Sequence, residues 1–229
     1  MPPLFHQLNR RIDHAALHSE VTERSILELC REAIHHDFYS VAVNPVWVET
    51  AVSALHGTRV KVLTVTGFPL GASRTDIKVA EAIEGVEDGA VEIDMVANIG
   101  YLASDRFSDV ETEIVKIRRN LPREVLLKVI IEAGKLTRDQ QIQATKAVIN
   151  GGAQFVKTCT GFFGGATVEQ VRMLVEAAND RIEVKASGGI RTLHDCRSLL
   201  EAGATRLGSS ASVQIMKELH TAEPPSDGR

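Results

Sequence analysis

The sequence predicts an α/β fold, a single (β/α)8 barrel of the TIM type. The prediction is based on the regular alternation of strand-like and helix-like patterns of apolar residues. Short runs rich in β-branched residues recur every 20 to 30 residues along the chain. The segments between them carry apolar residues at helical spacing, as in Ile26, Leu29 and Ala33. Eight strand–helix units of this kind are typical of a closed parallel barrel.

The predicted strands follow one another along the chain, each succeeded by a predicted helix. They are RIDHA (11–15), SVAVN (40–44), KVLTVTG (61–67), AVEIDMV (90–96), VLLKVIIE (125–132), FVKTCTG (155–161), IEVKASG (182–188) and TRLGSS (205–210). An open doubly wound sheet is the alternative arrangement. It usually has fewer strands and often begins with a glycine-rich dinucleotide turn, which this sequence lacks.

Capping residues mark the boundaries of the predicted helices. Thr137 with Gln140 and Thr167 with Gln170 match the capping box, in which each side chain satisfies a free backbone amide of the other residue. Glycines stand where the preceding helices should end, and we expect them to adopt the left-handed conformation of a C-cap. They are Gly89, Gly151, Gly152 and Gly203.

The length of the chain fits one domain, because α/β barrels routinely reach 229 residues as a single unit. We expect the catalytic barrel domain to occupy residues 1–219. The tail 220–229, HTAEPPSDGR, is rich in proline, glycine and polar residues and is predicted to be disordered.

Composition narrows the possible partners. The net charge is −4 with no basic cluster, which argues against nucleic acid. No apolar run reaches the length of a membrane span, and the N-terminus lacks the apolar segment of a signal peptide. Three cysteines without metal-like spacing, Cys30, Cys159 and Cys196, suggest reduced thiols. We therefore expect a cytoplasmic protein without a metal or other cofactor, whose partners are small molecules.

Three lysines lie inside apolar strands: Lys128, Lys157 and Lys185. Burying an ammonium group is costly, so a single strand lysine is best interpreted as one that points outward and reaches solvent. Three on consecutive strands at similar depth favour an inward orientation, with the amines meeting at one end of the barrel. Glu92, Asp94 and Glu132 would add carboxylates to the same interior.

Two neighbouring lysines supply a chemical mechanism. Lowering the pKa of an amine from about 10.4 to about 7 costs roughly 4.6 kcal/mol. One cation at about 4 Å, in an effective dielectric of about 20, supplies roughly 4 kcal/mol. A lysine pair therefore comes close to producing a neutral amine that can form a Schiff base, with desolvation adding the rest.

Glycine-rich turns follow the last three predicted strands, in GFFGGAT (161–167), SGG (187–189) and GSS (208–210). Each turn alone is as consistent with a tight turn as with a binding loop. Together, and with Arg191 nearby, they favour a phosphate site, because the loops after the last two strands commonly hold phosphate in these barrels.

At these residues the sequence resembles a known family. The segments VEIDMVANIG, FVKTCTGF and VKASGGIRT, within a match that runs from Ile12 to about Ala211, are similar to those of the deoxyribose-phosphate aldolases. The resemblance implies an aldehyde-lyase with a (β/α)8 barrel. Its reaction would be the reversible cleavage of 2-deoxy-D-ribose 5-phosphate to acetaldehyde and D-glyceraldehyde 3-phosphate through a lysine Schiff base.

The resemblance also implies a role for each matching residue. Lys157 would be the nucleophile, Lys185 the lysine that lowers its pKa, and Asp94 the carboxylate that relays protons through a water. Lys128 and Asp13 would order this network. The phosphate-binding positions would be Gly161, Gly188, Gly189, Arg191, Gly208 and Ser210. A homodimer is the assembly that the resemblance implies.

Several positions depart from the usual family residues. His18 stands where the family has lysine, Ala42 replaces a cysteine, and Cys159 replaces a serine. The loop 161–165 is one residue shorter than the common form. No catalytic position is lost, but the shorter loop bears on phosphate affinity and on the acceptance of non-phosphorylated substrates.

Two other classes of function compete with this interpretation. A different sugar-phosphate barrel enzyme, such as an isomerase, could use Glu92, Asp94 and Glu132 for acid–base chemistry. A barrel that only binds a phosphorylated metabolite would keep the glycine turns. The pairing of Lys157 with Lys185 argues against the isomerase, and three buried lysines argue against the binding protein.

Overall fold

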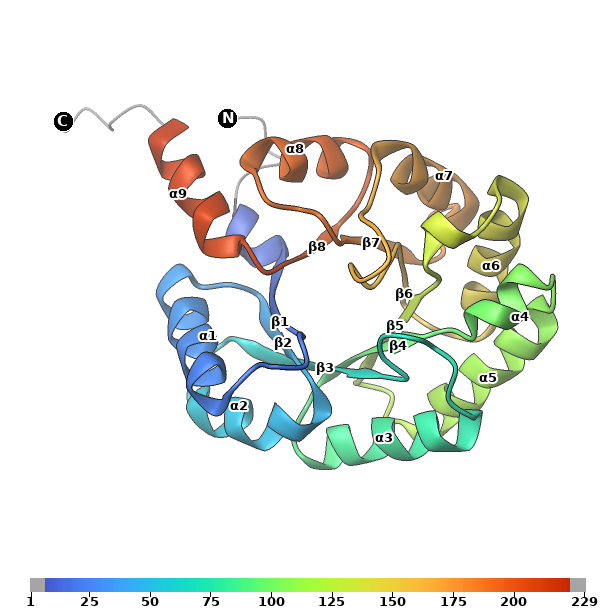
Figure 1. Cartoon of the computed structure of the whole chain (residues 1–229), viewed down its shortest axis with the longest axis horizontal. Coiled ribbons are helices and arrows are strands. Elements are labelled where there is room, and N and C mark those ends of the chain that lie inside the picture. Colours follow the sequence, from blue (N-terminus) through green and yellow to red (C-terminus); the bar gives the residue numbers. More distant parts are fainter. Residues whose placement is uncertain (1–6, 223–229) are drawn as a thin grey trace.

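The computed structural model describes residues 7–222 and contains the predicted closed barrel of parallel strands. The strands pair in sequence order, and β8 closes the ring against β1 (Figure 1). Their bounds are β1 Ile12–Ala16, β2 Ser40–Val43, β3 Lys61–Thr66, β4 Glu92–Val96, β5 Leu126–Ile130, β6 Phe155–Lys157, β7 Glu183–Ser187 and β8 Arg206–Ser209. Each predicted strand is confirmed, with ends that move by a few residues.

Helices surround the barrel and cover its outer face (Figure 1). They are α1 Glu23–His36, α2 Val48–Ala54, α3 Thr75–Glu87, α4 Ile99–Ala103, α5 Phe107–Asn120, α6 Arg138–Asn150, α7 Val168–Ala178, α8 Leu193–Glu201 and α9 Ser212–Ala222. Short 3-10 turns occur at Leu8–Arg11, Pro45–Trp47 and Ala133–Lys135. Within residues 7–222, no helix combines the length and the apolar character needed to cross a membrane.

The helix caps follow the sequence with one exception. Both predicted capping boxes are present, at Thr137 and at Thr167. Gly89, Gly152 and Gly203 have the positive φ expected of them. Gly151 was expected to be left-handed and is not: its φ is −67°, and the following glycine makes the turn. Glycine is needed there because a Cβ would lie 2.5 Å from Cγ2 of Ile114.

The C-terminal end differs slightly from the expected boundary. Helix α9 continues to Ala222, three residues into the segment 220–229 for which disorder was predicted. The remainder of that segment, 223–229, lies outside the described residues.

The apolar core lies between the strands and the helices. The outward side chains of the central strands are fully buried, among them Ile93, Met95, Leu127, Val129 and Val156. They belong to the same cluster as α5 and α6 residues such as Ile114, Ile117 and Val148. Each buried aliphatic side chain contributes about 1.5–3 kcal/mol. Since this outer layer supplies the apolar burial, the inside of the barrel can hold charged groups.

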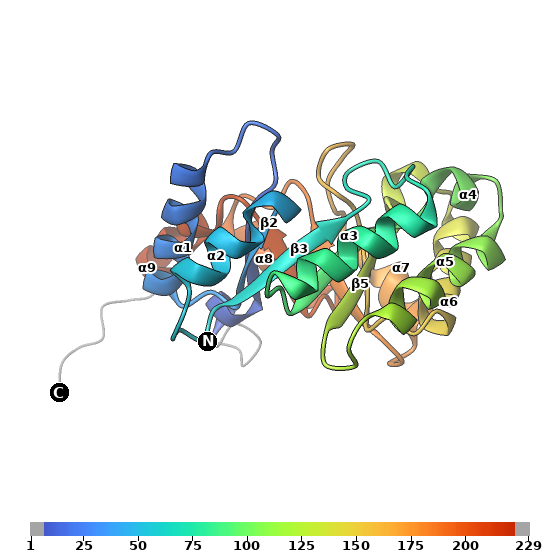
Figure 2. The same cartoon turned by 90° about the horizontal axis from the view of Figure 1, so that it is seen from below.

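The strand register brings the predicted polar residues side by side. Asp94 is opposite Lys128 on the next strand, and Lys157 is opposite Lys185. Lys185 is in turn opposite Arg206. Residues in register on parallel strands point to the same face, here the interior. The loops after β1, β3 and β6 rise on one side of the barrel in Figure 2, the side of the carboxyl ends of the strands.

Candidate active site

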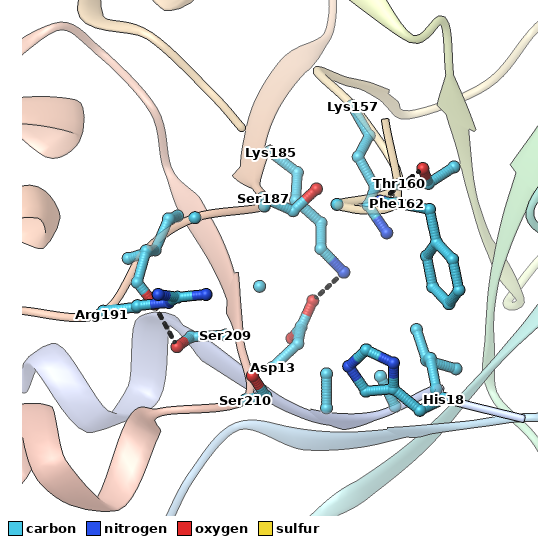
Figure 3. A pocket seen from close by; sticks show the side chains of 18 residues that line it. Asp13, His18, Lys157, Thr160, Phe162, Lys185, Ser187, Arg191, Ser209 and Ser210 are labelled. Carbon is cyan, nitrogen blue, oxygen red and sulfur yellow. Dashed lines mark hydrogen bonds and ion pairs between the residues drawn. The ribbon is translucent and has the colours of Figure 1, made fainter. Parts of the chain in front are cut away.

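A cavity of about 180 Å³ opens among the loops at the carboxyl ends of the strands. This is where barrel enzymes place their active sites. It is lined by Asp13, Ala15, Leu17, His18, Ala42, Lys157, Thr160, Gly161, Phe162, Lys185, Ser187, Gly188, Gly189, Ile190, Arg191, Gly208, Ser209 and Ser210. In Figure 3, Phe162 and His18 lie on the opposite side of the cavity from Arg191, with the two lysines between them.

The amines of the two cavity lysines meet at one carboxylate. Nζ of Lys157 lies 2.8 Å from Oδ2 of Asp94, and Nζ of Lys185 lies 2.7 Å from the same oxygen. Lys157 is 3% exposed and Asp94 is fully buried. The structure thus brings together the three residues that the sequence predicted as the reacting group, its partner lysine and its carboxylate.

Further charged side chains contact this cluster. Nζ of Lys128 is 2.5 Å from Oε2 of Glu92 and 3.0 Å from Oδ1 of Asp94. Oδ2 of Asp13 forms an ion pair with Nζ of Lys185 at 2.5 Å. Its other oxygen accepts from the hydroxyl of Ser40 at 2.7 Å. Lys128 and Asp13 are thus in contact with the cluster that they were predicted to order.

The pKa of Lys157 lies below its ordinary value, and burial is the largest cause. The neighbouring cations Lys185 and Lys128 lower this pKa further, while the carboxylate of Asp94 raises it. The sequence argument ranked the lysine pair first and desolvation second. The structure reverses that order, because the side chain is almost fully buried in the barrel interior.

The pKa values of Asp94 and Lys128 shift toward the charged form of each group. Burial raises the pKa of Asp94, but Lys128, Lys157 and Lys185 outweigh it, so this pKa lies well below the usual range. Burial lowers the pKa of Lys128, but Asp94, Glu92 and Asp13 outweigh it and raise the pKa above its ordinary value. Asp94 is therefore ionised and Lys128 charged at neutral pH, whereas Lys157 loses its proton more readily than Lys128 does.

Glu132 was predicted to add its carboxylate to the barrel interior, and this prediction is wrong. Strand β5 ends at Ile130, and Glu132 follows it in a left-handed conformation with φ of 50°. The turn aims its buried carboxylate at the β6 loop, where Oε2 accepts from the backbone N–H of Thr160 at 3.0 Å and from its hydroxyl at 2.8 Å. Glu132 anchors the loop that begins the glycine-rich segment.

The predicted phosphate positions all line the cavity. Gly161, Gly188 and Gly189 have φ of 90°, 83° and 73°, conformations that favour glycine. The loops also touch closely: a Cβ at Gly188 would lie 2.8 Å from the carbonyl oxygen of Gly164 and 2.9 Å from Cα of Gly161. Backbone amides on such turns can approach an anion. Gly208, Ser210 and Arg191 line the same cavity.

Comparison with known proteins places the chain in a family. The sequence-family model described as DeoC/LacD family aldolase matches residues 9–216, nearly the whole chain. The chain belongs to the DeoC/LacD aldolases.

Curated relatives and solved structures agree with this membership. A protein of Oceanobacillus iheyensis named deoxyribose-phosphate aldolase 1 is 45% identical over 210 residues, which cover 91% of this chain and 95% of the relative. The solved structure described as the unique tetrameric structure of deoxyribose phosphate aldolase from Aeropyrum pernix superimposes with a TM-score of 0.88 at 30% identity. The match covers 94% of this chain and 92% of the solved chain. Another solved structure, described as QR15, an aldolase, superimposes with a TM-score of 0.90 at 40% identity. The match covers 94% of this chain and 97% of the solved one.

Sequence reasoning missed two features of this DeoC/LacD aldolase. Arg206, the first residue of β8, is buried beside the interior carboxylates, although strand parity with Gly208 already placed it inside. His18 lines the cavity, with its ring centroid 5.4 Å from that of Phe162.

Proposed function

We propose that this chain is a class I aldolase that reversibly cleaves 2-deoxy-D-ribose 5-phosphate to acetaldehyde and D-glyceraldehyde 3-phosphate. The observation that carries the proposal is the environment of Lys157. Its buried amine lines the cavity, its pKa lies below the ordinary value, and one carboxylate is within 2.8 Å. A neutral amine is the nucleophile that an imine-forming aldolase requires. The family membership and the names of the relatives support the substrate.

The reaction would run through an iminium ion on Lys157. The neutral amine adds to the C1 aldehyde carbon of the open-chain sugar, and loss of water from the carbinolamine gives the iminium. Removal of the proton from the C3 hydroxyl breaks the C2–C3 bond, whose electron pair moves toward the iminium nitrogen as an enamine. Glyceraldehyde 3-phosphate leaves. Protonation of the enamine at C2 and hydrolysis then release acetaldehyde and restore the amine.

Asp94 and Lys185 would manage the protons of this sequence. The carboxylate of Asp94 touches both amines, so it can accept and return protons at the carbinolamine and enamine steps, through a water where the substrate is out of direct reach. Lys185 supplies a cation that disfavours protonation of Lys157. Lys128 and Asp13 would hold these two side chains in register.

The phosphate would bind at the glycine loops, on the side of the cavity that carries Arg191 and Ser210 (Figure 3). That assignment covers Gly161, Gly188, Gly189, Arg191, Gly208 and Ser210, all of which line the cavity. Phe162 and His18 form the opposite wall. The phosphate end of the substrate would therefore point toward Arg191 and Ser210 rather than toward that wall. The aldehyde end would then reach Lys157 between the two walls.

The deciding experiment traps the imine. We expect incubation with acetaldehyde or deoxyribose 5-phosphate, followed by borohydride reduction, to leave a covalent adduct that peptide mass spectrometry maps to Lys157. The Lys157→Leu variant should fold, as judged by circular dichroism, and show neither adduct nor turnover. No adduct at Lys157 in the wild type would contradict the proposal and favour an isomerase or a binding protein, which form none.

Assembly and location complete the proposal. A homodimer is supported by the family resemblance, although the similar aldolase from Aeropyrum pernix is described as a tetramer. Light scattering of the purified chain distinguishes the two. A cytoplasmic location is supported by Cys30, Cys159 and Cys196, which are free thiols in the structure and fit a reducing compartment.

A further inference from the structure

Arg206 is a buried cation below the cavity that the proposed reaction does not use. It is 7% exposed and does not line the cavity. Nη1 lies 2.8 Å from Oδ1 of Asp13 and 3.5 Å from Oε2 of Glu92. The guanidinium stacks on the ring of Tyr39, with Cζ 3.5 Å from the ring centroid. Both the ion pairs and the stack fix its position.

With Arg206 included, the barrel interior holds one cation more than it holds carboxylates, counted over the residues that the structure describes. The charged side chains are Asp13, Glu92 and Asp94 against Lys128, Lys157, Lys185 and Arg206. A guanidinium does not deprotonate in a folded protein. The excess positive charge is therefore relieved most readily when one lysine gives up its proton.

The contacts single out which lysine that is. Lys128 bonds to two carboxylates, Glu92 and Asp94. Lys185 also bonds to two, Asp13 and Asp94. Among the described ion pairs, Lys157 has one, to an oxygen that it shares with Lys185. Lys157, the lysine with the fewest carboxylate partners, is therefore the one whose ammonium form is stabilised least.

Other ionisable groups near Lys157 do not alter this balance. The carboxylate of Glu132 is turned to Thr160. Burial raises the pKa of the Cys159 thiol, which stays uncharged. His18 lies at the exposed mouth of the cavity. Around Tyr39, Arg10 and Lys61 approach the same ring as Arg206, but Lys61 is exposed to solvent and Arg10 is half-buried, so solvent screens both charges.

We propose that Arg206 is a positioning residue that keeps Lys157 in its neutral, nucleophilic form. By occupying Asp13 and Glu92, it leaves the interior without a carboxylate to hold a fourth ammonium or guanidinium group. It acts without touching the substrate. The inference rests on the proposed reaction through Lys157, and it adds a residue on β8, on the far side of Asp13 from the cavity, to the groups that set the working pH.

The test compares pH profiles of kcat/KM for deoxyribose 5-phosphate cleavage. Replacing the guanidinium in Arg206→Met removes the excess charge, so protonated Lys157 becomes easier to hold. We expect the acidic limb to move up by roughly one pH unit, with about tenfold lower kcat/KM near neutral pH and recovery at higher pH. Arg206→Lys keeps the charge and should keep the midpoint, even where it lowers thermal stability.

Glu92 provides a variant with the opposite sign. Glu92→Gln is nearly isosteric and increases the excess charge, so its acidic limb should move down. The double variant Arg206→Met with Glu92→Gln restores an excess of one and should return the midpoint toward that of the wild type. Lys61→Met is the matched control, because it removes a cation from the outer side of Tyr39 and should leave the profile unchanged.

The outcomes separate this inference from the proposed function. Borohydride trapping of the wild type at Lys157 tests the reaction itself. If trapping succeeds while Arg206→Met is folded and loses kcat without a shift of the midpoint, Arg206 is merely structural and the inference is wrong. If Arg206→Met does not fold, Arg206→Gln takes its place. An unshifted pH profile of kcat/KM in Glu92→Gln would also show the inference to be wrong, even if neither Arg206 variant folds.

Discussion

Lys157 and Lys185 share a single acceptor, Oδ2 of Asp94, at 2.8 and 2.7 Å. Their amines are thus close enough for each charge to oppose the other in a buried site. The two are not equivalent, since Lys185 has a second carboxylate in Asp13 at 2.5 Å. Lys157, which has no second carboxylate partner among the described ion pairs, is the lysine that we propose as the nucleophile.

Replacing Lys185 by leucine should displace the pH optimum upward. The pKa of Lys157 is lowered first by burial and then by Lys185 and Lys128, so loss of the Lys185 charge lets this pKa rise. We expect residual turnover, with the acidic limb of kcat/KM moved up by about one to two pH units and a tenfold loss per unit at neutral pH. Exposed Lys146→Met is the control. An unshifted limb in Lys185→Leu would show that Lys185 acts through something other than its charge.

Asp94→Asn should lower stability as well as activity. The carboxylate contacts three buried ammonium groups, and removing one partner of a buried ionic cluster costs about 3–5 kcal/mol. Urea unfolding at pH 7, monitored by circular dichroism, measures the change. Asp76→Asn, which removes an exposed ion pair with Lys116, should leave the unfolding midpoint where it is.

The pH dependence of unfolding gives a second measurement on the same variant. Burial raises the pKa of Asp94 and the three lysines lower it by more, so the folded value lies well below 3.8. The stabilisation is complete above the unfolded value and is lost as the pH falls through the folded one. The wild-type free energy of unfolding should therefore decline below about pH 4, and Asp94→Asn should decline less. Parallel decline in both proteins would assign the acid sensitivity to other carboxylates.

The barrel could be predicted from the sequence because its signals are local. Strand runs, capping boxes and the alternation that places Lys128, Lys157 and Lys185 on one face each depend on a few adjacent residues. The convergence of the lysines needed one assumption more, that consecutive strands are neighbours in the sheet. The observed register bears out that assumption.

What the sequence could not predict depends on where the strands end and on tertiary contacts. Glu132 has the parity of Lys128, but β5 stops at Ile130 and a left-handed residue redirects its carboxylate to Thr160. Arg206 begins its strand, where an arginine usually reaches solvent. Its burial depends on Asp13 of β1 and on Tyr39, which directly precedes β2, and both are far away in the sequence.

Gly188→Ala should raise KM for the phosphorylated substrate. Its φ of 83° is unfavourable for alanine, and the added Cβ would lie 2.8 Å from the carbonyl oxygen of Gly164 and 3.0 Å from Sγ of Cys159. We expect at least a tenfold rise in KM and about 1–3 kcal/mol lower stability. Gly57→Ala is the control, because its φ of 77° carries the same strain with open space around the Cβ. Equal effects of both changes on KM would argue that strain alone, rather than loop packing, disturbs binding.

Arg191→Ala should discriminate between substrates that differ only in the phosphate. The exposed guanidinium lines the cavity on the side away from Phe162 (Figure 3). A charge-assisted hydrogen bond to phosphate is worth about 1.5 kcal/mol or more, so KM for deoxyribose 5-phosphate should rise about tenfold.

The same variant should cleave unphosphorylated deoxyribose with unchanged kcat/KM, because the chemistry at Lys157 is untouched. Arg123→Ala is the matched control: this exposed arginine precedes β5 and therefore lies at the opposite end of the barrel. Raising the salt concentration should shrink the difference between wild type and Arg191→Ala, since the interaction is screened. An equal loss with both sugars would remove Arg191 from the phosphate site and leave the anion to the backbone amides of the glycine loops.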